Sequence, residues 1–276
     1  MNQEQILTAP RNPTFVSLRK LPAALWLSLL IVGQAVFAWY IFALYTQPFT
    51  SGDNTIFNRV LNNLHVPDQL LANFSIALHL FGGAVISIIG PLQLIPAIRE
   101  KALPFHRMLG RTYVITAMVI SIAGMTFILT RGAVGGIYMD VGFALYGFLL
   151  FSCAVQTWRL AMAKQMQAHR RWAIRLFALG MASWLYRVEY GFWGIINGGL
   201  PGHDSDTFQG SFDIFMDFAF YIPTLIAVEL YFYVRERFSD TAKQVALIVS
   251  LVVLVPSISL GCYAAAKGWW LPAIAG

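Results

Sequence analysis

The chain has 276 residues, of which 58% are hydrophobic and only 12% are charged. A soluble domain usually carries about 25% charged residues, so this composition excludes an ordinary soluble globular protein and indicates that the solvent is lipid. The formal net charge is +6, which we assign to cytoplasmic loops and not to the binding of nucleic acid.

Seven apolar runs are each long enough to cross a membrane as a helix. A helix needs about 20 apolar residues to span a hydrocarbon core of about 30 Å, and lipid offers no hydrogen-bond partners to other open backbone conformations. We therefore predict an all-α, polytopic membrane helical bundle of about seven transmembrane helices. It forms a single transmembrane domain over residues 1–276, with a core bundle at 70–194. The predicted spans cover residues 22–45, 70–97, 109–130, 141–163, 172–194, 214–234 and 244–266.

Two features of these runs bear on the fold. The second predicted span contains Pro91 and Pro96 near its end. Proline removes a helical hydrogen bond and kinks the chain, so we expect a bend in residues 90–96. Cys153 and Cys262 both lie within apolar runs, so we expect free thiols that pack as small hydrophobic side chains.

Basic residues set the expected orientation. Fifteen of the 19 Lys and Arg residues fall in segments on the side of the N-terminus, and the other side keeps only Arg59, Arg131, Arg187 and Lys267. Because Lys and Arg concentrate in cytoplasmic loops, we expect the N-terminus in the cytoplasm and the C-terminus outside. The expected location is the inner (plasma) membrane, as a multi-pass protein in contact with membrane lipid.

Two segments at the starts of predicted helices resemble each other. The sequences PFHRMLGRTY (104–113) and AHRRWAIRLF (168–177) each place a histidine beside arginines four residues apart, which share a helix face. If the third and fifth spans are neighbours, the two histidines lie at one depth, and the hairpins 70–130 and 141–194 form a parallel repeat.

These segments supply candidate ligands. Imidazole ligates haem iron or another metal, and guanidinium groups pair with carboxylates. His106 and His169 are therefore candidate metal ligands, and the candidate anion partners around a cofactor are Arg107, Arg111, Arg171 and Arg175. The alternative is that topology alone places these arginines, which would then contact anionic lipid headgroups.

His79 lies deeper than any other histidine. It follows about ten residues into the second predicted span, or about 15 Å along a helix, close to the midplane. Ionisable groups at such depth are costly and often functional, and the neighbouring Gly82 and Gly83 would admit a cofactor or another helix. We treat His79 as a candidate cofactor-binding residue, with a core histidine bonded to the next helix as the alternative.

The outer ends of the fifth and sixth spans carry a third polar group. Tyr186, Arg187, Glu189 and Asp217 are candidate substrate-binding residues. We expect Arg187 and Asp217 to form an ion pair. The alternative is an outward-facing pocket, whose expected aromatic and loop residues are Trp184, Tyr186, Tyr190, Trp193, His65 and His203.

Over residues 70–190 the chain resembles a family of predicted bacterial membrane proteins, domain of unknown function 2306 (DUF2306). The shared pattern consists of His79, GPLQ at 90–93, Arg99, HRMLGRTY at 106–113, Gly142, Phe143, HRRWAIR at 169–175 and Arg187. The resemblance implies a membrane bundle and supports this choice of residues, but it implies no activity. A looser likeness to membrane cytochromes of the b561 type implies haem b bound between helices through histidines.

Two functions follow as hypotheses. In the first, the protein is a membrane redox protein that binds haem b or quinol, with His106 and His169 as ligands and His79 as a deeper ligand or a quinone hydrogen-bond donor. In the second, it binds or transports a small amphiphile or lipid without redox chemistry, through the outer aromatic pocket.

Overall fold

The computed structural model describes residues 13–276, and no strand occurs in that range. The helices are α1 (Pro13–Tyr45), α2 (Gln47–Ser51), α3 (Leu70–Gln93), α4 (Pro96–Lys101), α5 (Leu103–Arg131), α6 (Gly136–Met162), α7 (Met166–Gly180), α8 (Ala182–Asn197), α9 (Ser211–Ala219), α10 (Ile222–Arg237), α11 (Asp240–Ala265) and α12 (Leu271–Ala275). A 3₁₀ helix (Asn54–Asn58) and a π-helical turn (Ala266–Trp270) complete the chain. The predicted all-α fold is confirmed.

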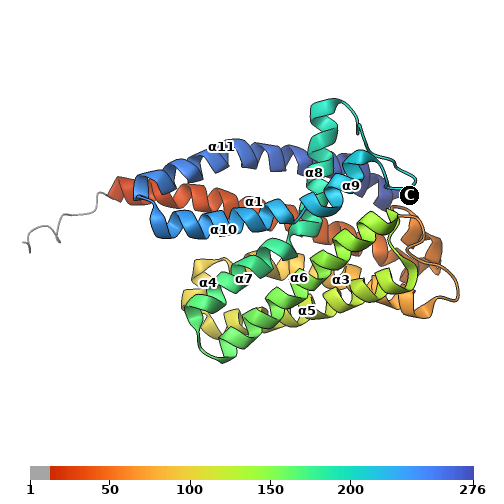
Figure 1. Cartoon of the computed structure of the whole chain (residues 1–276), viewed down its shortest axis with the longest axis horizontal. Helices are drawn as coiled ribbons and strands as arrows, with labels where there is room; N and C mark the ends of the chain where they lie inside the picture. The colour runs from red at the N-terminus through yellow and green to blue at the C-terminus, as the bar shows by residue number, and fades with distance from the viewer. Residues whose placement is uncertain (1–12) are drawn as a thin grey trace, which may run out of the picture.

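Within the described part of the chain, six helical stretches are long and apolar enough to cross a membrane. They are Ala24–Ser51, Leu70–Gln93, Leu103–Arg131, Gly136–Met162, Ser211–Arg237 and Val245–Ala275. Each overlaps one of the seven predicted spans. The remaining one, 172–194, is helical but divided between α7 and α8, and the chain changes direction between these two helices (Figure 1).

The break between α7 and α8 disturbs helical hydrogen bonding inside the bundle, and two tyrosines surround it. Tyr146 of α6 donates its hydroxyl to the carbonyl of Leu179, with 2.8 Å between the oxygens. The next residue is Gly180, where an added Cβ would collide with the hydroxyl of Tyr113. A helix end at membrane depth is tolerated where the protein supplies such partners, and no proline in the apolar run marks this position.

The proline-rich end of the second span also divides. Helix α3 continues through Pro91 and ends at Gln93, and α4 begins at Pro96 after an extended Ile95. The expected bend therefore takes the form of a helix end. Cys153 and Cys262 are free, as expected.

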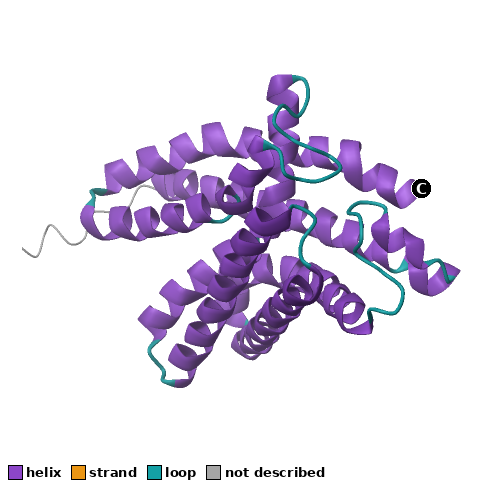
Figure 2. Cartoon of the chain, turned by 45° about the vertical axis from the view of Figure 1, so that its right-hand side comes forward, coloured by secondary structure: helices purple, strands orange, loops and turns teal. Residues whose placement is uncertain are grey.

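Helices α1, α10 and α11 run in similar directions, α5 and α6 slant relative to them, and the start of α1 and the C-terminus lie at opposite ends of the bundle (Figure 1). The longer loops gather near the C-terminal end, whereas short turns join the helices at the other end (Figure 2). We call the end with the longer loops the loop end. Which end faces the cytoplasm stays a prediction from the basic residues.

Two buried clusters hold the helices together. One contains Phe37 and Tyr40 of α1 with Trp184 of α8. The other contains Tyr146 of α6 and Phe220, which follows α9. Side chains from both clusters face the same internal cavity, so the two clusters form its walls.

Helices α8 and α11 approach so closely that their backbones touch. A Cβ added at Gly261 of α11 would collide with the carbonyl oxygen of Val188, and one added at Gly191 of α8 would collide with the carbonyl oxygen of Gly261. Small residues permit this kind of close helix packing in membranes. The contact fixes α8, which carries several residues of the cavity wall.

We expect Gly261→Ala to destabilise the protein, because a backbone oxygen cannot move aside as a flexible side chain does. Overpacking of this kind costs about 1–3 kcal/mol. The matched control is Gly268→Ala, since an added Cβ there meets no atom within 4 Å. Thermal unfolding in detergent should show a lower midpoint for Gly261→Ala only, and equal midpoints for the two variants would contradict the packing argument.

Candidate functional site

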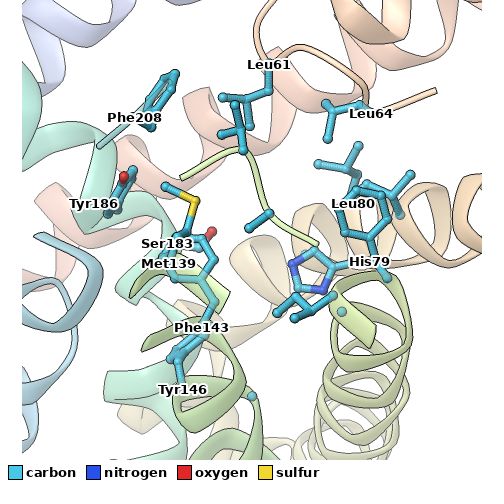
Figure 3. Close-up of a pocket in the computed structure, with 18 of the residues that line it drawn as sticks. Leu61, Leu64, His79, Leu80, Met139, Phe143, Tyr146, Ser183, Tyr186 and Phe208 are labelled. Atoms are coloured by element: carbon cyan, nitrogen blue, oxygen red, sulfur yellow. The ribbon is translucent and has the colours of Figure 1, made fainter. Parts of the chain in front are cut away.

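A cavity of about 500 Å³ lies among α1, α3, α5, α6 and α8. Its wall is mostly apolar, and the polar side chains that reach it include His79, Ser183, Tyr186 and Arg187. Figure 3 shows His79 on one side of the cavity and Tyr186, Ser183 and Tyr146 on another, with Phe208 and Leu61 at its loop end. Volumes of this size suit small-molecule ligands.

His79 is fixed on the cavity wall by a backbone contact. Its Nδ1 lies 2.8 Å from the carbonyl oxygen of Ile120 in α5. A carbonyl oxygen only accepts, so Nδ1 carries the proton and Nε2 is left as an acceptor. Nε2 has no hydrogen-bond partner among the described residues. His79 is thus both bonded to the next helix and available to a ligand.

A glycine opposite His79 allows the ring to come this close. A Cβ added at Gly124 of α5 would lie 2.8 Å from Nδ1 of His79. Of the two glycines singled out in the sequence, Gly82 packs against Ile120, and Gly83 lines the cavity. The sequence analysis missed Gly124, because only the pairing of α3 with α5 reveals its role.

Arg187 of α8 is half-buried on the cavity wall. Its Nη1 donates to the carbonyl of Ser183 over 2.8 Å, and its Cζ lies 5.1 Å from the centre of the Phe37 ring. No carboxylate forms an ion pair with it in the described part of the chain. The cation therefore faces a mostly apolar cavity without a paired carboxylate, and the other charged side chains that line this cavity are Arg131 and Asp206.

The predicted ion pair between Arg187 and Asp217 is wrong. Asp217 of α9 is completely buried, and neither carboxylate oxygen has a hydrogen-bond partner. It packs against Gly142 of α6, whereas Arg187 extends toward Phe37 of α1. The two residues therefore point to different helices.

Only some of the other predicted substrate-binding residues reach the cavity. Tyr186 lines the cavity, and Glu189 and Asp217 do not. The predicted aromatic pocket is not formed as expected. Trp184 packs on Gly33 and Trp193 stacks on Phe212 with 4.8 Å between ring centres, so both are used in helix and loop packing.

Asp213 anchors the loop at residues 198–210, whose residues 206–209 line the cavity. We call this loop the second outer loop, after the orientation predicted from the basic residues. Its buried carboxylate accepts four hydrogen bonds. The donors are the Tyr190 hydroxyl (2.6 Å), Nδ1 of His203 (2.7 Å) and the backbone N–H groups of Asp204 (2.9 Å) and Gly210 (3.0 Å). His203 is thus part of the loop's anchor and not a cavity residue.

Within the same loop, Asp204 closes a tight turn. Its Oδ1 accepts from the backbone N–H groups of Asp206 (2.9 Å) and Thr207 (3.0 Å). These hydrogen bonds stabilise the ionised form and lower the pKa of the Asp204 carboxyl. The turn presents Phe208 to the cavity, next to the ring of His203.

Arg131 fastens the loop at residues 52–69, which joins α2 to α3 and which we call the first outer loop. Residues 61–64 of this loop line the cavity. The guanidinium group at the end of α5 donates to four oxygens, each at 2.9 Å. The acceptors are Oε1 of Gln69, the carbonyls of Asn63 and Leu64, and Oδ1 of Asn73. His65, the other predicted loop residue, stacks on Phe57 and lies outside the cavity wall.

The histidine and arginine segments lie at the end of the bundle opposite the loop end. His106 and His169 are close enough to interact electrostatically. Nδ1 of His169 lies 3.0 Å from the carbonyl oxygen of Thr157, whereas the buried Nδ1 of His106 has no partner. Among the described residues, no group of three or more His, Cys, Asp or Glu side chains is placed to hold a metal ion.

Two of the four predicted anion-binding arginines already have carboxylate partners on α10. Arg171 pairs with Glu236 at 2.8 Å, and Arg175 forms a two-point pair with Glu229 at 2.6 and 2.9 Å. Arg107 and Arg111 are exposed on the surface of α5. The four arginines therefore do not converge on one buried site.

We expect Asp213→Asn to loosen the second outer loop, because a neutral amide weakens the charge-assisted hydrogen bonds to Asp213. Hydrogen exchange followed by mass spectrometry should become faster in residues 200–210. Asp206→Asn removes a charge from the same loop at an exposed position and serves as the control. Equal exchange in both variants would show that Asp213 does not anchor the loop.

Comparison with known protein families matches residues 76–231 to the family described as "Predicted membrane protein (DUF2306)". The match covers more than half of the 276 residues and includes His79, Arg187 and Asp217. No curated protein and no solved structure matches the chain, and nothing supports the likeness to b561-type cytochromes. The resemblance noted in the sequence is confirmed: the chain belongs to the DUF2306 family of predicted membrane proteins.

Proposed function

We propose that this integral membrane protein binds a small anionic amphiphile in the cavity, with the anionic group at Arg187 and the apolar part against the hydrophobic wall. The unpaired guanidinium group of Arg187 carries this proposal. A charge within a membrane is costly unless it is paired, and guanidinium pairs strongly with carboxylate or phosphate. The location that fits a helical bundle of this kind is the inner membrane.

The remaining wall of the cavity suits such a ligand. Apolar residues from two buried clusters surround the space and favour a hydrocarbon segment. Nε2 of His79 accepts hydrogen bonds, so it matches a hydroxyl group on the ligand. The two outer loops form the loop end of the cavity, and a ligand that enters there requires them to move.

The chemistry of the same residues gives less support to a redox function. An oxidised quinone offers only carbonyl acceptors, which Nε2 of His79, itself an acceptor, does not match, whereas the hydroxyl groups of a quinol do match it. For haem, two of the arginines predicted to bind propionates are paired with Glu229 and Glu236. Binding of an amphiphile is therefore the function that the described side chains favour.

Binding of dodecanoate to the protein in lipid nanodiscs tests the role of Arg187. We expect Arg187→Gln to weaken binding about 10- to 100-fold, since hydrogen bonds to charged groups contribute about 1.5–3 kcal/mol. Arg111→Gln removes an exposed arginine outside the cavity and should bind as the wild type does. Dodecanol, which lacks the charge, should bind weakly to all three proteins.

Two results would contradict the proposal. One is equal dodecanoate affinity in Arg187→Gln and the wild type. The other is dodecanol affinity as high as that of dodecanoate, because the cavity would then select for apolar bulk and not for an anion.

An absorption spectrum separates the two hypotheses. We expect that protein expressed in the presence of added haem, and then purified, shows no Soret band. A Soret band that disappears in His106→Ala or His169→Ala would instead favour the redox function, with haem b bound by those histidines.

A further inference from the structure

We propose that Asp217 is a proton-binding carboxyl group that is neutral at neutral pH, and that an anion in the cavity makes it hold its proton more tightly. The first half stands on the surroundings of Asp217 alone. The second half rests on the proposed function, because it requires an anion beside Arg187.

Asp217 has the surroundings of a neutral acid. Its side chain is completely buried, and both oxygens lack hydrogen-bond partners. No Lys, Arg or His of the described chain forms an ion pair with it. An ionised carboxylate that is buried without a partner is strongly unfavourable, and such a group takes up a proton instead.

Asp213 provides the contrast one helical turn earlier. Its carboxylate is equally buried but accepts four hydrogen bonds from donors on α8 and the second outer loop. Only the ionised form accepts at all of these positions. A second negative charge four residues away on the same helix would be repelled, so the pair holds one negative charge, and Asp213 carries it.

No cation among the neighbours offsets a charge on Asp217. The titratable groups that interact with it are Asp213 on its own helix, Tyr186 on α8 and Tyr221 at the start of α10. The Tyr221 hydroxyl donates to the carbonyl of Gly142 over 3.2 Å, so this donor is used on α6. The described helices around Asp217 thus present to it a carboxyl group, phenol groups or backbone, and no cation.

Asp217 lies directly behind the cavity wall. Tyr186 and Phe220 line the cavity; Tyr186 interacts with Asp217, and Phe220 follows it by three residues. An anion at Arg187 would therefore disfavour a second negative charge at Asp217. Because coupling between two binding sites is reciprocal, protonation of Asp217 favours the anion as much as the anion favours the proton. At a pH where free Asp217 is ionised, binding of the anion is therefore accompanied by uptake of one proton from water.

Infrared spectroscopy tests the protonation of Asp217 directly. A protonated carboxyl group has a carbonyl stretch distinct from that of a carboxylate. We expect Asp217→Asn to remove one such band from the spectrum at neutral pH. Glu189→Gln is the matched control, because Glu189 also has a buried oxygen without a partner, and this variant should leave the Asp217 band in place. Identical spectra for the wild type and Asp217→Asn would overturn the assignment.

Stability gives a second measurement. Asparagine is nearly isosteric with a neutral aspartic acid, so Asp217→Asn should leave the thermal midpoint unchanged. Asp213→Asn should lower it, because Asp213 is ionised and hydrogen-bonded. Equal losses in the two variants would show that Asp217 is charged and paired, contrary to the proposal.

The pH dependence of dodecanoate binding tests the coupling. In the pH range in which Asp217 of the ligand-free protein has lost its proton, the wild-type affinity for dodecanoate should fall about tenfold per pH unit. This slope is the one expected when binding takes up one proton. Asp217→Asn should remove this decline, and His79→Gln should keep it, which separates Asp217 from the nearest cavity histidine. The coupling would be overturned if the affinity of Asp217→Asn still fell with pH, or if the wild-type affinity stayed constant up to alkaline pH. Either result would leave the proposed function standing. Absence of dodecanoate binding at every pH would overturn both, and the infrared measurement would still decide whether Asp217 is protonated.

Discussion

Polar groups inside a membrane must be satisfied by the protein itself, because lipid supplies no hydrogen bonds. Much of this bundle can be understood from that constraint. The α7–α8 break is placed where Tyr146 reaches the carbonyl of Leu179. The His79 ring is fixed by the carbonyl of Ile120. In each case a side chain from a neighbouring helix compensates for an irregular or polar feature, so polar contacts help to determine which helices pack together.

Against this background the unsatisfied groups are the informative ones. Arg187 faces the cavity without a counterion, and Asp217 is buried behind the wall without a donor. One is a permanent cation, and the other becomes neutral by taking up a proton. Their different chemistry suggests different roles: Arg187 selects for an anion, whereas Asp217 adjusts the charge of the site when that anion arrives.

The sequence predicted the helices well because membrane helices depend on length and apolar composition, which are local properties. Six of the predicted spans coincide with helical stretches long and apolar enough to cross a membrane, one of which is divided into α9 and α10. The depth of His79 correctly indicated a side chain facing the interior. The division of 172–194 could not be predicted, since Gly180 and Met181 carry no strong helix-breaking signal. Their effect depends on Tyr113 and Tyr146, which come from other helices.

Pairings between side chains were harder to predict for the same reason. Arg171 and Arg175 were expected around a cofactor, but the packing of α7 on α10 brings them to Glu236 and Glu229. The expected Arg187–Asp217 pair failed because Arg187 extends toward Phe37 of α1, whereas Asp217 packs against Gly142 of α6. Charge and spacing identified residues that matter, whereas helix directions determined their partners.

The two outer loops depend on charged residues that lie beside the cavity, namely Arg131 on its wall and the buried Asp213. Three of the four hydrogen bonds of Arg131 hold the first loop, and three of the four of Asp213 hold the second. Asp213 has a double role in this arrangement, because it carries the charge of the Asp213–Asp217 pair and also anchors the loop over the cavity. If the pair holds one negative charge, a shift of that charge from Asp213 to Asp217 weakens the loop's anchor. The position of one proton on α9 would then link the charge beside the cavity to the hydrogen bonds that hold its outer loop.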